Sequence, residues 1–476
     1  MLKWFMVPVV ILAVGIFIKL MFYPESCNMD NPSNRDFNKY FGLTVAQNHF
    51  MTRSADECNI DYLYRPALPQ AVIKPDRSSS TFVILAPYGT GKTMLRCAFD
   101  QNLDKRYFKV ILLNTHLSEY IQRFVSANGK NNSLENSLEN WESKDFAQIL
   151  LSVLVTQFLS QFNDRWIDLA NMSMDEKMDL IFIACYYFDR HATIELENFA
   201  NSLFKKTGFF ASPYKEQDAI TQTKENNRYE DKVLLIQFKN DIRNFKILDL
   251  NQNSKLHLLL AIVEGEKYQH NAKSKQMHET VFQDLVKFSS FMKKHMGKKV
   301  VFIIDGIDEN QNFFSANGVN VPQLNRFYQS SVSQEIVVMT MANHFDLAMF
   351  YVAANGVELS DVIIRKDKFP IYTVTWNTKS LLNYADYILE KLRSLSASSR
   401  CKPIPSFKNL VNYSDERIAE IVNKIPTPRA LHFFMTELIR EMNSDAAHVQ
   451  QPFIANFDNI NNASEKSKKS FNQVRA

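Results

Sequence analysis

The sequence predicts an α/β protein with a parallel-sheet core, a large helical insertion within that core, a C-terminal helical lid and an N-terminal transmembrane helix. Three observations lead to this prediction. Short apolar runs at 81–85, 107–113 and 299–304 lie next to segments with helical spacing, an alternation typical of parallel sheets. The chain between the second and third runs is mostly helical in pattern. Residues 4–18 form an apolar run without a charge.

The N-terminal segment, residues 1–23, predicts a membrane anchor. After Lys19 the apolar run continues to Tyr23. A helix that rises about 1.5 Å per residue covers roughly 28 Å over residues 4–22, close to the ~30 Å hydrocarbon core of a bilayer. A cleavable signal peptide is one alternative, although no A-x-A-like cleavage site follows, and a buried hydrophobic helix is another. We expect a single-pass protein that contacts the membrane through residues 4–23.

The rest of the chain has the composition of an ordinary globular protein. Hydrophobic residues make up 46% and charged residues 22%, close to the averages for folded soluble chains. Lys and Arg number 55 against 51 Asp and Glu, a net charge of +4 without a basic run, so nucleic acid is not expected as a partner. The absence of HExxH and GxSxG removes zinc hydrolases and the commonest serine hydrolases from the first rank.

The five cysteines predict neither a disulfide framework nor a metal site. They are odd in number and lie at least 31 residues apart, which excludes a CxxC pattern. We therefore expect a reducing compartment.

The segment boundaries follow from changes in pattern along the chain. Asn, Asp and Pro punctuate the stretch after the anchor, and the last residues are rich in Asn, Ser and Lys. The expected parts are the anchor 1–23, a stalk 24–79, the first part of the core 80–130, the helical insertion 131–290, the second part of the core 291–376, the lid 377–442 and a flexible tail 443–476. Helices are predicted at 145–162, 174–189, 193–206, 256–264 and 280–294, and a further strand at 335–340.

A loop after the first apolar run has the pattern of a phosphate-binding loop. Only 11 glycines occur in the chain, yet Gly89 and Gly91 lie close together in this loop. It matches G-x-x-x-x-G-K-[ST] except that Ala86 replaces the first glycine. Such a loop turns successive backbone N–H groups toward phosphate oxygens, which glycine permits because it has no Cβ. The expected nucleotide-binding residues are Ala86, Pro87, Tyr88, Gly89, Thr90, Gly91, Lys92, Thr93 and Met94.

Two residues at the end of this loop have specific expected roles. Lys92 would reach the β- and γ-phosphates, and the Thr93 hydroxyl would ligate Mg²⁺. An ordinary glycine turn is the alternative explanation. The apolar strand before the loop and the helical pattern after it favour the phosphate-binding loop.

An acidic cluster follows the apolar run at 299–304. Asp305 would end a buried strand and hold Mg²⁺, normally through water. Glu309, or in second place Asp308, would polarise the attacking water as general base. Taken alone, the cluster is also compatible with a solvated acidic turn. The phosphate-binding loop elsewhere in the chain favours the metal site.

The two motifs, APYGTGKT and VVFIIDGIDE, resemble the Walker A and Walker B motifs of P-loop ATPases. The DGxDE form is similar to the additional-strand group, in particular to signal-transduction ATPases and their AAA+ relatives. The resemblance covers 80–113, 298–376 and the lid, and it implies a P-loop NTPase core with ATP and Mg²⁺ as cofactors. Lys92 and Asp305 are 213 residues apart, and an insertion of this length resembles that of the KAP-type membrane-associated NTPases.

Two further matches extend this resemblance. Asn343, after the run at 335–340, resembles the sensor-1 residue of AAA+ proteins, which contacts the γ-phosphate or the attacking water. Arg429, in the segment PTPRAL, is similar to the sensor-2 arginine, which reaches from the lid to the phosphates. A capping role for Asn343 and a surface position for Arg429 are the alternatives. Arg365 is the candidate for an arginine finger, which a nucleotide-dependent oligomer would need.

Together these features predict a membrane-tethered ATPase switch. ATP binding and hydrolysis would move the lid and the insertion against a protein partner, and the residues involved would be Lys92, Glu309, Asp308, Asn343 and Arg429. A nucleotide-gated scaffold without turnover is the first alternative, and a P-loop phosphotransferase is the second. GTP is disfavoured because the chain has no NKxD motif.

The need for ATP also predicts where the protein lies. ATP is abundant in the cytosol, so the domain after Tyr23 is expected to face the cytosol or another ATP-containing compartment. Four N-x-[ST] matches, at Asn131, Asn171, Asn412 and Asn462, would carry glycans if the domain were lumenal.

Overall fold

A computed structural model describes residues 36–41, 58, 64, 68–73, 80–128, 138–163, 172–187, 195, 198–199, 202–203, 281–315, 318–353, 359, 369–394, 405–445 and 453–475. The chain divides into two compact units. Unit 1 holds residues 1–74, 86–101 and 373–476, and unit 2 holds residues 75–85 and 102–372. Each unit has its own hydrophobic core.

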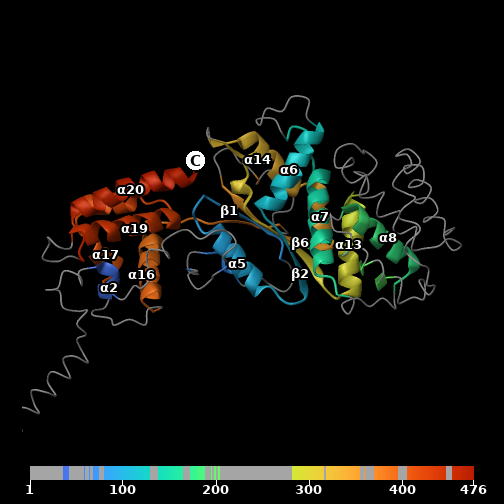
Figure 1. The fold of residues 1–476 in the computed structure, drawn as a ribbon, viewed down its shortest axis with the longest axis horizontal. Helices are drawn as coiled ribbons and strands as arrows, with labels where there is room; N and C mark the ends of the chain where they lie inside the picture. The colour runs from blue at the N-terminus through green and yellow to red at the C-terminus, as the bar shows by residue number, and fades with distance from the viewer. Residues whose placement is uncertain are drawn as a thin grey trace, which may run out of the picture. The chain divides into compact units, whose positions relative to one another are not determined.

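Unit 2 is built on a five-stranded parallel sheet (Figure 1). Neighbouring strands follow the order β2, β3, β6, β1, β7. Their bounds are β1 Phe82–Ala86, β2 Tyr107–Leu112, β3 Lys299–Ile304, β6 Phe345–Val352 and β7 Ile371–Thr373. A small antiparallel pair, β4 (Phe314–Ser315) and β5 (Gly318–Val319), lies outside this sheet. The sheet confirms the predicted α/β class and the strands predicted at 81–85, 107–113 and 299–304.

β3 pairs in parallel with β2 on one side and with β6 on the other. β2 pairs with β3 from Tyr107 opposite Lys299 to Leu112 opposite Ile304. β3 pairs with β6 from Val300 opposite Phe345. All eight residues of β6 are buried, and since successive side chains point to opposite faces of a strand, both faces of β6 are covered.

A buried carboxylate joins the starts of three strands. Asp346, 1% exposed at the start of β6, accepts hydrogen bonds from Lys299 Nζ at 2.7 Å and from Thr81 Oγ1 at 3.2 Å. The backbone N–H of Ser80 donates to the same carboxylate at 3.1 Å. Because a buried charge is costly unless it is paired, this cluster favours one alignment of β1, β3 and β6.

Among the helices whose bounds the structure describes in unit 2, six share one core with the sheet. They are α6 Asn114–Asn128, α7 Ser143–Ser160, α8 Met174–Tyr187, α13 Val281–His295, α14 Val321–Ser331 and α15 Gln334–Met341. α7 packs on β2 and α13 packs on β3. The helices predicted at 145–162, 174–189 and 280–294 are confirmed. The described part of the predicted insertion therefore covers the sheet and shares its core.

Residues 334–341 form helix α15, where the sequence analysis predicted a strand at 335–340. Ser333 caps this helix, because its side chain accepts a hydrogen bond from the Ile336 N–H. The next strand of the sheet is β6, which begins at Phe345. A short run of apolar residues suits a buried strand and a buried helix equally well, which explains the wrong prediction.

The described elements of unit 1 are mainly helices. They are α2 Phe37–Phe41, α4 Gln70–Ile73, α5 Lys92–Asn102, α16 Thr378–Ser394, α17 Phe407–Leu410, α18 Glu416–Asn423, α19 Pro428–Asp445 and α20 Phe457–Arg475. The segment 377–442, predicted as a helical lid, contains α16 to α18 and most of α19. Leu381 of α16, Phe434 of α19 and Ile460 of α20 belong to the same core.

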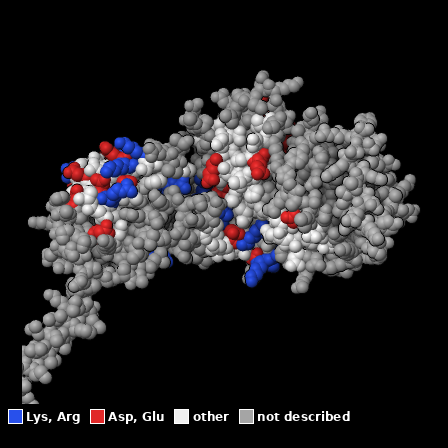
Figure 2. All heavy atoms as spheres, viewed as in Figure 1, with Lys and Arg blue, Asp and Glu red and all other residues white. Residues whose placement is uncertain are grey.

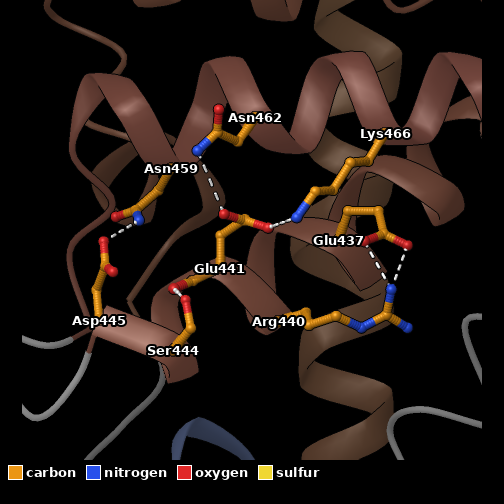
Figure 3. A network of polar contacts seen from close by, with 8 residues as sticks. All are labelled: Glu437, Arg440, Glu441, Ser444, Asp445, Asn459, Asn462 and Lys466. Atoms are coloured by element: carbon orange, nitrogen blue, oxygen red, sulfur yellow. Dashed lines mark hydrogen bonds and ion pairs between the residues drawn. The ribbon is translucent and has the colours of Figure 1, made fainter.

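The end of the chain is helix α20, not the flexible tail predicted for 443–476. Ile460 and Ala463 are fully buried, and polar contacts join α20 to α19 (Figure 3). Glu441 of α19 accepts hydrogen bonds from Lys466 and Asn462 of α20. The composition of α20 is so polar that its narrow apolar side was missed. Over these C-terminal helices, Lys and Arg are interspersed with Asp and Glu (Figure 2).

Several pieces of the predicted stalk pack within unit 1. Phe37 and Phe41 of α2 are buried, and their rings contact Phe453 at 5.8 and 5.2 Å between centroids. Cys58 forms a disulfide with Cys97 of α5. The number and spacing of the cysteines predicted no disulfide framework and did not reveal this bond, because an odd number of cysteines can still include a pair. The disulfide also removes the support that the cysteine pattern lent to a reducing compartment.

Several predicted features lie outside the described residues. They include the anchor 1–23, the helix 256–264 and Arg365. The helix predicted at 193–206 lies largely outside them as well. Among the helices that the structure describes, none combines the length and the apolar character needed to cross a membrane.

Candidate functional site

The loop between β1 and α5, predicted to bind phosphate, turns through two glycines with positive φ angles. Gly89 has φ 78° and Gly91 has φ 95°, in the left-handed region that glycine adopts without strain. The Thr90 hydroxyl donates a hydrogen bond to the Pro87 carbonyl at 2.7 Å, which closes the loop on itself. Strand, loop and helix follow one another as predicted.

Lys92 is the first residue of α5 and is largely buried. It is 7% exposed, and its Nζ lies 3.5 Å from the carbonyl oxygen of Ala86 at the end of β1. The ammonium group therefore turns back across the loop. Thr93 and Met94 follow in the first turn of α5, where the helix dipole is positive.

The segment that opens α19 lies directly against this loop. The backbone N–H of Arg429 donates to the Gly89 carbonyl at 3.1 Å. A Cβ added at Gly89 would lie 2.8 Å from Arg429 Cβ and 3.1 Å from Thr427 Oγ1, so a side chain has no room there. The Arg429 guanidinium stacks on the Tyr88 ring, 4.6 Å from its centroid. Unit 1 thus brings the predicted lid arginine to the predicted phosphate-binding loop.

A tryptophan makes a second contact with the loop. Trp376, which precedes α16, donates from its indole N–H to the Thr90 carbonyl at 3.1 Å. Its ring contacts those of Tyr384 at 5.3 Å and Tyr64 at 6.1 Å between centroids. The carbonyls of two successive loop residues therefore both accept hydrogen bonds from this helical part of unit 1.

The acidic cluster in unit 2 forms a turn at the end of β3. Asp305, 1% exposed, continues the pairing with β2, since its N–H donates to the Leu112 carbonyl at 3.1 Å. Gly306 has φ 78° and begins the one-turn helix η9 (Ile307–Glu309). Glu309 is exposed, and the structure describes only the backbone of Asp308.

Asn114 holds this acidic turn in place. Asn114 opens α6 just after β2, and its Nδ2 donates to the Glu309 carbonyl at 3.3 Å. A Cβ added at Gly306 would lie 3.3 Å from the Asn114 backbone nitrogen and 3.8 Å from Glu309 Oε2. The Glu309 carboxylate therefore lies over the glycine that starts the turn.

The sensor-1 assignment of Asn343 is wrong. Asn343 directly precedes β6 and does not follow a strand. Phe345 pairs with Val300 at the start of β3, whereas Asp305 follows the end of β3. Asn343 therefore lies at the N-terminal ends of these parallel strands and Asp305 at their C-terminal ends. Asn343 is exposed, with φ 62°, and its carbonyl accepts a hydrogen bond from Lys293 Nζ at 3.4 Å. It turns the chain from α15 into β6, and the predicted strand at 335–340 caused the error.

The remaining predicted site residues fall into two groups, one in each unit. The loop residues, Lys92, Thr93 and Arg429 belong to unit 1, and Asp305, Asp308 and Glu309 belong to unit 2. β1 and β3 are strands of one parallel sheet, so their C-terminal ends lie on the same side of it. α/β sheets generally bind their ligands at the C-terminal ends of the strands. Among the described residues, no group of three or more His, Cys, Asp or Glu could hold a metal ion. Thr93 carries a hydroxyl and Asp305 a carboxylate, and each is an oxygen donor of the kind that Mg²⁺ prefers.

Sequence reasoning missed three residues beside these motifs. Thr427 and Trp376 lie against the loop from parts of the chain more than 280 residues away. Thr427 belongs to the segment PTPRAL, in which only Arg429 was assigned a role, and no pattern in the sequence marks Trp376. Asn114 had a signal, since it is a polar residue directly after the buried strand β2.

Comparison of the chain with protein-family models, with curated proteins and with solved structures gave no match. The case for a function therefore rests on the loop and on the acidic turn.

Proposed function

We propose that this protein binds ATP with Mg²⁺ and hydrolyses it, and that its nucleotide state changes how the C-terminal helices engage the phosphate-binding loop. The strand order carries the proposal. β6 lies between β1, which leads into the loop, and β3, which leads into Asp305. The resemblance to the additional-strand P-loop ATPases implies such an extra strand between the strands that bear the two motifs.

Binding of the phosphates would rely on the loop and the start of α5. Gly89 and Gly91 allow the backbone amides of the loop to converge on one anion. Lys92, whose Nζ lies 3.5 Å from the Ala86 carbonyl oxygen, would donate to a phosphate oxygen. The phosphate carries the charge opposite to that of the ammonium group, which favours the bound state.

Hydrolysis would use the acidic turn. Asp305 and Thr93 would hold Mg²⁺, which neutralises charge on the phosphates when it is bound. Glu309 is exposed and would accept the proton of the attacking water, with Asp308 as the second candidate. Because Asn114 anchors the Glu309 backbone, the base is held on a defined turn.

Coupling to the lid would pass through Arg429. Its guanidinium stacks on Tyr88, and a γ-phosphate would offer it a stronger, charged partner. Loss of that phosphate would return Arg429 to the ring. The lid equilibrium would therefore differ between the ATP and ADP states.

The proposal includes a membrane tether through residues 4–23, with the ATPase domain facing the cytosol or another compartment that contains ATP. Its partner would be a protein. Mass analysis of the protein expressed in a eukaryotic host tests the orientation. Glycans at Asn412 or Asn462 would contradict it.

Nucleotide binding and turnover provide the main test. Purified protein should bind a non-hydrolysable ATP analogue with Mg²⁺, and Lys92→Ala should weaken this binding at least about tenfold. Glu309→Gln should keep binding and lose about 100-fold or more in turnover, the usual contribution of a general base. Lys105→Ala and Glu139→Gln, at exposed positions away from the two motifs, are the matched controls. Equal binding by wild type and Lys92→Ala would contradict the proposal.

A nucleotide-gated scaffold is the second candidate. The position of Asn343 favours it, because this residue lies at the start of β6 and not at the strand end where the resemblance places the sensor-1 contact. If the protein is a scaffold, wild type binds the analogue, Lys92→Ala does not, and neither wild type nor Glu309→Gln hydrolyses ATP.

A further inference from the structure

Two neighbouring peptide groups of the phosphate-binding loop are held from outside the loop. The carbonyl of Gly89 accepts a hydrogen bond from the Arg429 backbone at 3.1 Å. The carbonyl of Thr90 accepts one from the Trp376 indole at 3.1 Å. Both donors belong to the C-terminal helical part of unit 1.

These bonds also orient amide groups. The described chain contains no cis peptide bond, and in a trans peptide the carbonyl and the following N–H point in opposite directions. Holding the Gly89 carbonyl therefore orients the Thr90 N–H, and holding the Thr90 carbonyl orients the Gly91 N–H. Each of these amides points away from the group that holds its carbonyl.

The loop needs such support because of its glycines. Gly89 and Gly91 have positive φ angles, and glycine has more backbone conformations available than any other residue. Without an external contact, the peptides between them could rotate and turn a carbonyl toward an anion. A binding site that must first order itself loses affinity, and a preorganised site does not.

We propose that Trp376 is a positioning residue for nucleotide binding, which sets the Gly91 amide toward the phosphates through the Thr90 carbonyl. This inference rests on the proposed function and adds to it. Its chemical target is the polyphosphate chain, whatever base the nucleotide carries. Trp376 is partly buried against Tyr384 and Tyr64, so its indole is itself held in place.

The test removes the indole N–H and keeps an aromatic ring. Trp376→Phe should weaken binding of a non-hydrolysable ATP analogue by about 3- to 10-fold, the usual range for one lost hydrogen bond. Inorganic tripolyphosphate, which has no base or sugar, should lose affinity by the same factor. At saturating ATP the turnover should stay within about twofold, because the acidic turn is unaltered. The loss therefore falls on KM and not on kcat.

Trp141→Phe is the matched control. Trp141 also donates its indole N–H to an oxygen, that of Ser330 at 2.9 Å, but it lies in the core of unit 2. It should change stability without changing affinity. If Trp376→Phe unfolds, a benzothienylalanine at position 376 replaces the N–H by sulfur and keeps the shape of the ring.

The outcomes separate this inference from the proposed function. If wild type binds neither the analogue nor tripolyphosphate, the proposed function fails. If wild type binds, Lys92→Ala does not, and Trp376→Phe binds as tightly as Trp141→Phe, only the role of Trp376 is overturned. A loss seen with the ATP analogue and not with tripolyphosphate would also overturn it, because Trp376 would then act on the base or sugar.

Discussion

Asp145, in the first turn of α7, is a buried carboxyl group at the end of a helix. Burial raises its pKa to about 6, although its carboxylate accepts a hydrogen bond from the Glu142 N–H at 2.9 Å. In the unfolded chain the pKa of an aspartate is about 3.9. Between these two values the folded protein binds more protons than the unfolded chain, so the free energy of unfolding falls as pH rises from about 4 to about 6. Two pH units correspond to roughly 3 kcal/mol.

Asp145→Asn should remove this dependence. The asparagine oxygen can still accept the hydrogen bond from Glu142, and the side chain no longer ionises. The stability of the variant relative to wild type should therefore increase by up to roughly 3 kcal/mol from pH 4 to pH 7. Urea unfolding at several pH values measures it. Asp458→Asn, which changes an exposed first-turn aspartate in α20, should show no comparable increase. Parallel profiles for wild type and Asp145→Asn would refute the assignment.

Single residues also show where sequence reasoning works. The structure around the loop at 86–94 could be predicted because it depends on neighbours in the chain, namely the strand before it and the helix after it. The position of Asp305 at the end of a strand was predictable for the same reason. The position of Asn343 could not be predicted in this way, because it depends on whether the residue precedes or follows a strand. The strand wrongly predicted at 335–340 placed Asn343 after a strand, whereas it precedes β6.

Among the elements, α20 is the clearest departure from expectation. It packs along α19 through a polar network in which Glu441 takes part from α19 (Figure 3). Glu437, one turn earlier, contacts Arg440 of its own helix instead. Of these two buried glutamates of α19, Glu441 contacts α20 and Glu437 contacts its own helix.

Glu441→Ala should loosen α20. Lys466 and Asn462 would lose their contacts with α19, and hydrogen bonds to a charged group are each worth about 1.5–3 kcal/mol. Because the Lys466 side chain is 54% exposed, we expect about 1–2 kcal/mol in all. Amide hydrogen exchange across 457–475 should accelerate about 5- to 30-fold. Glu437→Ala should leave this exchange nearly unchanged, and equal acceleration in both variants would contradict a specific role for Glu441.

The whole molecule carries one covalent constraint among the described residues, the disulfide between Cys58 and Cys97. The two cysteines are 39 residues apart, and a native disulfide typically contributes about 2–4 kcal/mol. It joins the segment expected to be a stalk to the helix that follows the phosphate-binding loop.

Reduction should therefore destabilise the protein. We expect dithiothreitol to lower the melting temperature of unit 1 by several degrees, which corresponds to about 2–4 kcal/mol. Cys58→Ser should have the melting temperature of the dithiothreitol-treated wild type, whether or not dithiothreitol is present. A thiol count that does not rise by two on reduction would show that the bond is absent.

The sequence by itself determined the α/β class, most of the strands, the order of strand, glycine loop and helix at 82–102, and the position of Asp305 after β3. These features depend on local spacing and on the conformations that particular residues allow. The tertiary structure decided that 334–341 is a helix, that α20 packs on α19, that Cys58 pairs with Cys97 and that Trp376 holds the Thr90 carbonyl. Three of these features depend on contacts between distant parts of the chain. The helix at 334–341 comes from a short pattern that suits both a strand and a helix, and only packing selects the helix.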